Sequence, residues 1–133
     1  MRALWLAVVV AALPVAAQQI PSNSWAWWAS PVVRDLNLSQ DQIQKVHATV
    51  REYRPRLIDL RAAVQKADLD VEDAFNDENF DARRATEAGD RLVAARTELG
   101  KALAQLSLRL RAALTADQWR ELQKRKPQNQ KER

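Results

Sequence analysis

Residues 81–113 read DARRATEAGDRLVAARTELGKALAQLSLRLRAA, and the apolar side chains in this stretch recur at steps of three and four. This spacing places one apolar stripe along one side of an α-helix. The stripe consists of Ala85, Ala88, Leu92, Ala95, Leu99, Ala102, Leu106, Leu110 and Ala113. At about 1.5 Å per residue, this helix would be a rod of roughly 50 Å, which needs a partner of similar length.

The residues just upstream provide that partner. The same alternation of three and four runs through Ile43, Val46, Val50, Tyr53, Leu57, Leu60, Val64, Ala67, Val71 and Ala74. The two stripes are separated by Asn-Asp-Glu-Asn at 76–79, a short polar sequence typical of turns. The sequence therefore predicts an all-α fold, a long antiparallel helical hairpin with short helices at its open end.

The composition bounds the size and class of the fold. The 133 residues make one small domain, and 47% hydrophobic and 29% charged residues allow it to fold. Two glycines and few aromatic residues (five Trp, one Tyr, two Phe) favour helices over a β-sandwich. Because much of the apolar content is alanine, the core should be shallow, and we expect a flat or curved sheet of helices, which dimerisation would complete, rather than a globular ball.

The N-terminus resembles a secretory signal peptide. Arg2 supplies the positive charge, residues 3–13 are apolar, and the sequence up to Ala17 ends in a cleavage site of small residues. The apolar stretch is too short to cross a bilayer as a helix, although an uncleaved anchor is the alternative reading. We expect cleavage after Ala17, no stable membrane insertion and, despite the sequence pI of about 9.8, no nucleic-acid partner.

The mature chain begins with a segment that we predict to be a flexible linker, residues 18–29. Ser30 and Pro31 then indicate the start of a short helix, and the helical domain should extend over residues 30–126. We expect Trp28 to pack on the open end of the hairpin, whereas the sequence leaves the roles of Trp25 and Trp27 open. The basic tail, residues 127–133, should be disordered.

Two copies of one capping motif start two helices. Ser39 and Thr115 are good N-caps, and the glutamine three residues after each can return a hydrogen bond to the cap, which makes a capping box. The leucine before each cap completes a hydrophobic staple with the residue after the glutamine. The motif residues are Leu38, Ser39 and Gln42 in the first copy, and Leu114, Thr115 and Gln118 in the second.

Proline and glycine mark special positions within the two long helices. Pro55 interrupts the first stripe without shifting its phase, which predicts one bent helix rather than two. Gly89 and Gly100 lie three turns apart on one face of the second helix. They are either tolerated exposed glycines or a place where a second backbone approaches closely.

Charges are segregated along the predicted hairpin. Residues 68–81 contain seven acids and no base, while residues 51–66 are mostly basic. Such runs usually form solvated faces, but they can also steer an acidic or extended partner. The candidate client-binding residues are Arg51, Arg54, Arg56, Arg61 and Lys66.

No constellation of residues in the sequence indicates an enzyme. There is no cysteine and no glycine-rich phosphate loop, and the serine and threonine caps have no His–Asp pair nearby in the sequence. His47 is the only histidine, and its helical neighbours Gln44, Val50 and Arg51 are not metal ligands. We therefore expect no cofactor, and His47 remains the one candidate metal ligand.

The two L-[ST]-x-x-Q copies, at 38–42 and 114–118, flank a helical hairpin behind a signal peptide. In this the chain resembles the LTxxQ-motif family of periplasmic proteins, with its Spy- and CpxP-like chaperones and the related heavy-metal resistance proteins ZraP and CnrX. The resemblance implies a periplasmic, cradle-shaped homodimer whose basic, partly apolar concave face holds unfolded proteins without ATP. Ser39 replaces the threonine of the motif, which a helix cap tolerates.

The leading hypothesis is an ATP-independent periplasmic chaperone or stress-response protein that binds unfolded or partly folded proteins. The alternative is a metal-responsive regulator of a membrane signalling system, which would need a metal site that His47 alone does not make. A third possibility is a helical structural module without clients. Holding activity that weakens with salt would separate the first from the third.

Overall fold

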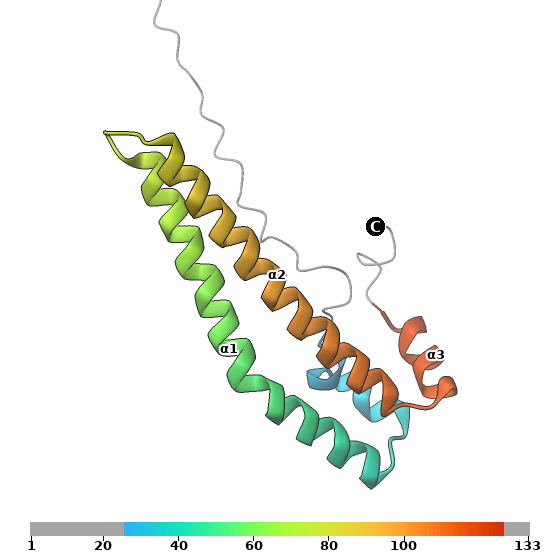
Figure 1. Cartoon of the computed structure of the whole chain (residues 1–133). Helices are drawn as coiled ribbons and strands as arrows, with labels where there is room; N and C mark the ends of the chain where they lie inside the picture. Colours follow the sequence, from blue (N-terminus) through green and yellow to red (C-terminus); the bar gives the residue numbers. More distant parts are fainter. Residues whose placement is uncertain (1–25, 127–133) are drawn as a thin grey trace, which may run out of the picture.

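The computed structural model describes residues 26–126. This part of the chain consists of helices joined by short irregular segments, and it contains no strand. Two short 3₁₀ helices, η1 (Trp27–Ala29) and η2 (Pro31–Leu36), precede the long helices α1 (Gln40–Asn76) and α2 (Ala82–Ala112), and α3 (Ala116–Lys124) follows. The predicted all-α hairpin is confirmed: α1 and α2 pack against each other, with the short helices at the open end (Figure 1).

The hairpin has a thick core at its open end and a thin one toward the tip. The main cluster of buried side chains joins η1, η2, α1, α2 and α3 through Trp27, Leu36, Val46, Leu57, Leu99, Ala102, Leu106, Leu110, Leu114 and Leu122. Near the tip, the buried cluster consists of Ala74, Ala85 and Ala88 alone. Because alanine buries little apolar area, the tip contributes much less to the hydrophobic stability of the fold.

Both predicted capping boxes are present. The Ser39 hydroxyl accepts a hydrogen bond from the Gln42 amide at 3.2 Å, and the Gln42 side chain accepts one from the Ser39 amide at 2.9 Å. Thr115 and Gln118 repeat the arrangement at the start of α3. Leu38 and Trp119 pack against the main core cluster, where Leu114 is itself buried.

α1 runs through Pro55 without interruption, and its ribbon changes direction near the middle (Figure 1). Proline lacks the N–H that would donate to the carbonyl of residue 51, and its ring crowds that carbonyl, so the bend follows from local sterics. The prediction of one bent helix is confirmed. No helix within residues 26–126 is long and apolar enough to cross a membrane.

One boundary prediction is wrong. Residues 27–29 were expected to belong to a flexible linker, but they form η1, and the Trp27 side chain is only 6% exposed. These residues are ordered by the core, because the large indole of Trp27 covers the apolar open end of the hairpin, which Leu110 and Leu122 also line. The predicted signal peptide, the rest of the linker and the basic tail lie outside the described residues.

The helix starts and ends agree with the capping arguments. Ser30 caps η2 by accepting a hydrogen bond from the Val32 amide at 3.4 Å, with Pro31 at the first position. Asp81 caps α2 by accepting from the amides of Arg83 and Arg84. Between η2 and α1, Asn37 has φ 49°, a left-handed conformation that asparagine tolerates and that redirects the chain into α1.

Candidate functional site

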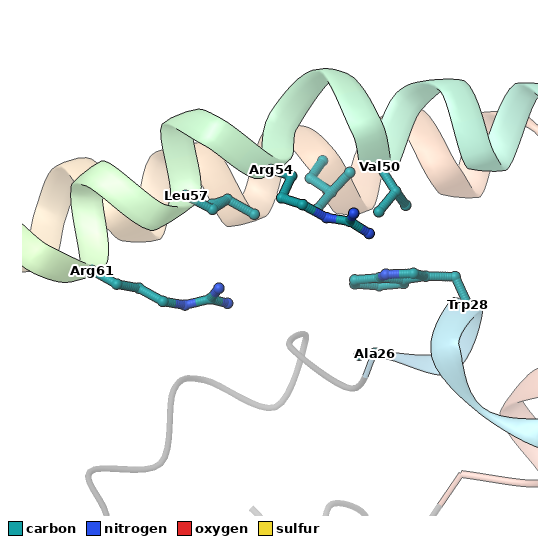
Figure 2. Close-up of a pocket in the computed structure, with 7 residues that line it drawn as sticks. Ala26, Trp28, Val50, Arg54, Leu57 and Arg61 are labelled. Carbon is teal, nitrogen blue, oxygen red and sulfur yellow. The ribbon is translucent and has the colours of Figure 1, made fainter.

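A groove of about 240 Å³ lies on the open-end half of the hairpin, beside the bend in α1. Its lining residues come from η1 with the residue before it, from α1 and from α2 (Figure 2): Ala26, Trp28, Val50, Arg54, Leu57, Arg61 and Leu106. The four residues from α1 follow one another at steps of four, three and four, which places them on one face of the helix. The groove is therefore apolar at its base and basic along one edge.

Arg54 and Arg61 supply the charge of the groove. In Figure 2 both side chains extend from α1 toward the space beside the Trp28 indole. Both residues are exposed, and neither forms an ion pair with any part of the chain within residues 26–126. Two guanidinium groups without a carboxylate partner give the groove an unbalanced positive charge.

Trp28 is held in place by its neighbours. Its ring meets that of Trp27 edge to face, with the ring centroids 5.9 Å apart and an angle of 83° between the planes. Trp27 is buried in the main core, so it anchors Trp28, which packs on that core and stays partly exposed. The predicted packing of Trp28 is confirmed, and the same side chain also lines the groove.

The five predicted client-binding residues do not form one surface. Arg54 and Arg61 share the groove, whereas Arg56 is two residues from Arg54, about 200° around the helix. Arg51 is exposed outside the groove lining. Lys66 forms an ion pair with Asp70 at 3.1 Å, which neutralises part of its charge. The sequence pattern identified the basic segment, but only the fold distinguishes its faces.

Other arginines of the hairpin serve the fold. Arg109 of α2 pairs with Glu52 of α1 at 2.8 Å and stacks over the Tyr53 ring, with 5.4 Å from its guanidinium carbon to the ring centroid. Hydrogen bonds to Glu52 and then Tyr53 raise the pKa of Arg109 above its usual value. At the open end, Arg125, which directly follows α3, pairs with Asp35 of η2 at 2.9 Å and so links these two short helices.

The residues that the two capping motifs supply meet at the open end. Gln42 donates to Gln118 Oε1 at 2.6 Å and to the Ala113 carbonyl at 3.0 Å. Gln118 donates back to Gln42 Oε1 at 3.1 Å and to the Leu36 carbonyl at 3.4 Å. These motif residues therefore join the start of α1 to the start of α3, and they do not line the groove.

The side chains of the described part do not fit a transition-metal site. Residues 26–126 contain no group of three or more His, Cys, Asp or Glu side chains that could hold a metal ion. His47 is exposed on α1, and the sequence outside the described part adds neither histidine nor cysteine. Zinc, nickel and copper sites use imidazole or thiolate ligands, so this donor set is unsuitable.

Comparisons with known proteins point to one family. No curated protein and no solved structure gives a significant match to the chain. A family model described as heavy-metal resistance matches residues 3–121, which covers most of the sequence and nearly all of the described helices. This match agrees with the part of the predicted resemblance that concerns heavy-metal resistance proteins such as ZraP and CnrX. The chain belongs to the heavy-metal resistance family.

Proposed function

We propose that this member of the heavy-metal resistance family is an ATP-independent periplasmic chaperone that holds unfolded or partly folded proteins. The observation that carries the proposal is the groove, in which Arg54 and Arg61 lie beside Trp28 and Leu57 and have no carboxylate partner within residues 26–126. The secretory character of residues 1–17 supports a periplasmic location.

The groove offers the two interactions that an unfolded polypeptide can use. Apolar client side chains would contact the indole of Trp28 and the aliphatic side chains of Val50, Leu57 and Leu106. Client carboxylates would pair with the guanidinium groups, whose planar shape suits carboxylate oxygens. Neither interaction depends on a fixed sequence order, so the binding would be promiscuous.

The shape of the groove suits weak and reversible binding. It is shallow and small compared with the segment of chain that an unfolded protein exposes, so a client gains little from any one site. Affinity would come from charge attraction during encounter and from several apolar contacts along the curved hairpin. A holding protein that needs no ATP must release its clients, and shallow contacts permit release.

The test is the suppression of aggregation of a chemically unfolded model protein by the mature chain, residues 18–133, without ATP. We expect suppression at near-stoichiometric ratios and a loss of most of it in the variant Arg54→Glu with Arg61→Glu. Arg56→Glu is the control, because Arg56 is also exposed but lies on another face of α1. Equal loss in the control variant, or no suppression by the wild type, would refute the proposal.

The family match favours one alternative, a metal-responsive regulator of a membrane signalling system. Calorimetric titration with Zn²⁺, Ni²⁺ and Cu²⁺ discriminates between the two. The regulator requires stoichiometric binding that His47→Ala abolishes. The chaperone requires holding activity that neither a chelator nor His47→Ala changes.

A further inference from the structure

The tip of the hairpin presents two exposed aromatic rings that the fold does not use. Phe75, near the end of α1, is 63% exposed, and Phe80, just before α2, is 56% exposed. Their ring centroids lie 6.0 Å apart, so the two side chains form one apolar patch across the turn. The buried cluster near the tip is made of alanines with the partly buried Val71, and neither phenylalanine belongs to it. Neighbouring exposed aromatic side chains of this kind are typical of a binding surface.

The half of the hairpin that carries this patch is acidic. Residues 66–96 contain nine acids and five bases, whereas residues 26–65 and 97–126 together contain seven acids and thirteen bases. The described part of the chain is therefore negative toward the tip and positive in the open-end half, where the groove lies. A partner of the tip should carry positive charge.

Two glutamates supply the negative charge next to the rings. Glu72 lies about one turn before the first ring on α1, and Glu78 lies in the turn between the two rings. Both are exposed, and neither forms an ion pair within residues 26–126. Other acids of the tip have arginines nearby: Asp68 and Asp77 form ion pairs at 3.1 and 2.8 Å, and Asp73 lines a separate small pocket with two arginines. The tip is thus an aromatic patch with two unpaired carboxylates beside it.

The tip and the groove favour opposite charges. Arg54 and Arg61 attract carboxylates and repel lysine and arginine side chains, so the groove alone does not suit the basic part of an unfolded polypeptide. At the tip, the carboxylates of Glu72 and Glu78 attract the same cations. The faces of the phenyl rings also attract cations, and the rings contact aliphatic and aromatic side chains. A segment that combines lysine or arginine with apolar side chains matches this surface.

Both surfaces lie on one side of α1. Four exposed residues follow one another at steps of seven along the helix: Arg54, Arg61, Asp68 and Phe75. A seven-residue step returns to nearly the same side of an α-helix. Arg61 and Phe75 are about 21 Å apart along the helix axis. About six or seven residues of extended polypeptide cover this distance, so one client segment can reach both surfaces.

We propose that the tip is a second client-binding site, which takes basic segments with apolar side chains, while the groove takes acidic ones. The inference rests on the proposed function, because its ligand is an unfolded polypeptide, and it assigns a charge pattern to that ligand. Clients in which a basic and an acidic segment are separated by about seven or more residues would occupy both sites. Occupying two weak sites at once raises the apparent affinity, and each contact can still break separately.

The test measures the binding of two labelled peptides to the mature chain, residues 18–133, by fluorescence anisotropy at low salt. Both peptides contain leucine and phenylalanine spaced by serine, and they differ only in carrying several lysines or, at the same positions, glutamates. The wild type should bind both. Glu72→Lys with Glu78→Lys should weaken binding of the lysine peptide at least about tenfold, and Phe75→Ser with Phe80→Ser at least about fivefold. Neither tip variant should weaken binding of the glutamate peptide by more than about twofold.

Two further variants serve as controls. Asp59→Lys with Asp90→Lys makes the same change in net charge at two exposed acids that form no ion pair in the described part. Val93→Ser with Leu108→Ser removes two apolar side chains of α2 that are 64% and 70% exposed. Both controls should bind the lysine peptide within about twofold of the wild type. Circular dichroism of each variant verifies that the helices are intact.

The groove variant Arg54→Ala with Arg61→Ala separates this inference from the proposed function, since it should lose affinity for the glutamate peptide alone. A lysine peptide that fails to bind the wild type, or that binds both tip variants as tightly as the wild type, would overturn the inference. Binding of the glutamate peptide at the groove would then leave the proposed function standing. Tip substitutions that change the sedimentation coefficient of the protein without changing peptide binding would assign the patch to a second copy of the chain, and they would also overturn the inference.

Discussion

Gln42 and Gln118, 76 positions apart in the sequence, exchange two hydrogen bonds between their side-chain amides, at 2.6 and 3.1 Å. Each glutamine also closes its own capping box, so one side chain serves both a helix start and a contact between two helix starts. The repeated motif therefore has a structural explanation that a single capping box would not give. It fixes the first turn of α1 against the first turn of α3.

This relationship predicts that Gln118→Ala is more damaging than the loss of an ordinary cap. The substitution removes the capping-box bond and the amide pair, and it leaves Gln42 with fewer partners at a partly buried position. We expect a loss of about 2–3 kcal/mol of unfolding free energy, measured by urea denaturation. Gln105→Ala, an exposed glutamine of α2, should change it by less than about 0.5 kcal/mol. Similar small effects of both substitutions would contradict this account.

The uneven core predicts uneven stability along the hairpin. Leucines dominate the core at the open end, while three alanines with the partly buried Val71 fill it near the tip. Hydrogen exchange monitored by mass spectrometry should therefore show faster exchange for amides of residues 67–90 than for those of residues 99–110. Equal protection of the two regions would show that the leucine cluster does not dominate the stability.

A core substitution tests the same distribution at one residue. Leu106 is 1% exposed and belongs to the main cluster, and Leu106→Ala should cost about 3 kcal/mol or more through the cavity that it leaves. Leu108→Ala is the control, because Leu108 is 70% exposed on the same helix and should cost less than about 1 kcal/mol. Thermal unfolding followed by circular dichroism measures both, and a smaller cost for Leu106→Ala than for Leu108→Ala would be incompatible with this core.

Pro55 links the shape of α1 to the groove. Pro55→Ala restores a backbone donor for the carbonyl of residue 51 and relieves the crowding there, so the helix should become straighter and more stable by about 1 kcal/mol or more. Straightening should also move Arg54 and Val50 relative to Leu57 and Arg61, which lie on the other side of the bend. We expect higher thermal stability together with weaker holding of clients. If stability rises and holding is unchanged, the bend does not shape the groove.

The hairpin could be predicted from the sequence because its two long apolar stripes depend only on helical periodicity, and both stripes run without interruption. The ends of the helices followed from caps at Ser39 and Thr115, which act within a few residues. Trp27 could not be placed in this way, because its burial depends on how the chain reverses at the open end. In the sequence, only the large apolar side chain of Trp27 and its position next to Trp28 indicated that it could be buried.

The groove was predicted only in part for the same reason. A run of bases on one helix pointed to Arg54 and Arg61, but it could not show that Trp28 lies beside the two arginines. The ion pair of Lys66 with Asp70, four residues further along the same helix, was open to prediction from the spacing. The helical angle separates Arg56 from Arg54, and that angle was available from the sequence. The contribution of Leu106 required the packing of α2 on α1.

The most direct test of the central claim measures binding at the groove itself. A fluorescently labelled, permanently unfolded protein is titrated with the mature chain at low and high salt, and its anisotropy is recorded for the wild type, Trp28→Ala, Arg54→Ala with Arg61→Ala, and Arg56→Ala. We predict that affinity falls at least about fivefold for Trp28→Ala at both salt concentrations, because that contact is apolar. The double arginine variant should bind weakly at low salt and lose most of its salt dependence, while Arg56→Ala should behave as the wild type. Equal affinity and equal salt dependence for all four proteins would contradict the assignment of this groove as the client-binding site.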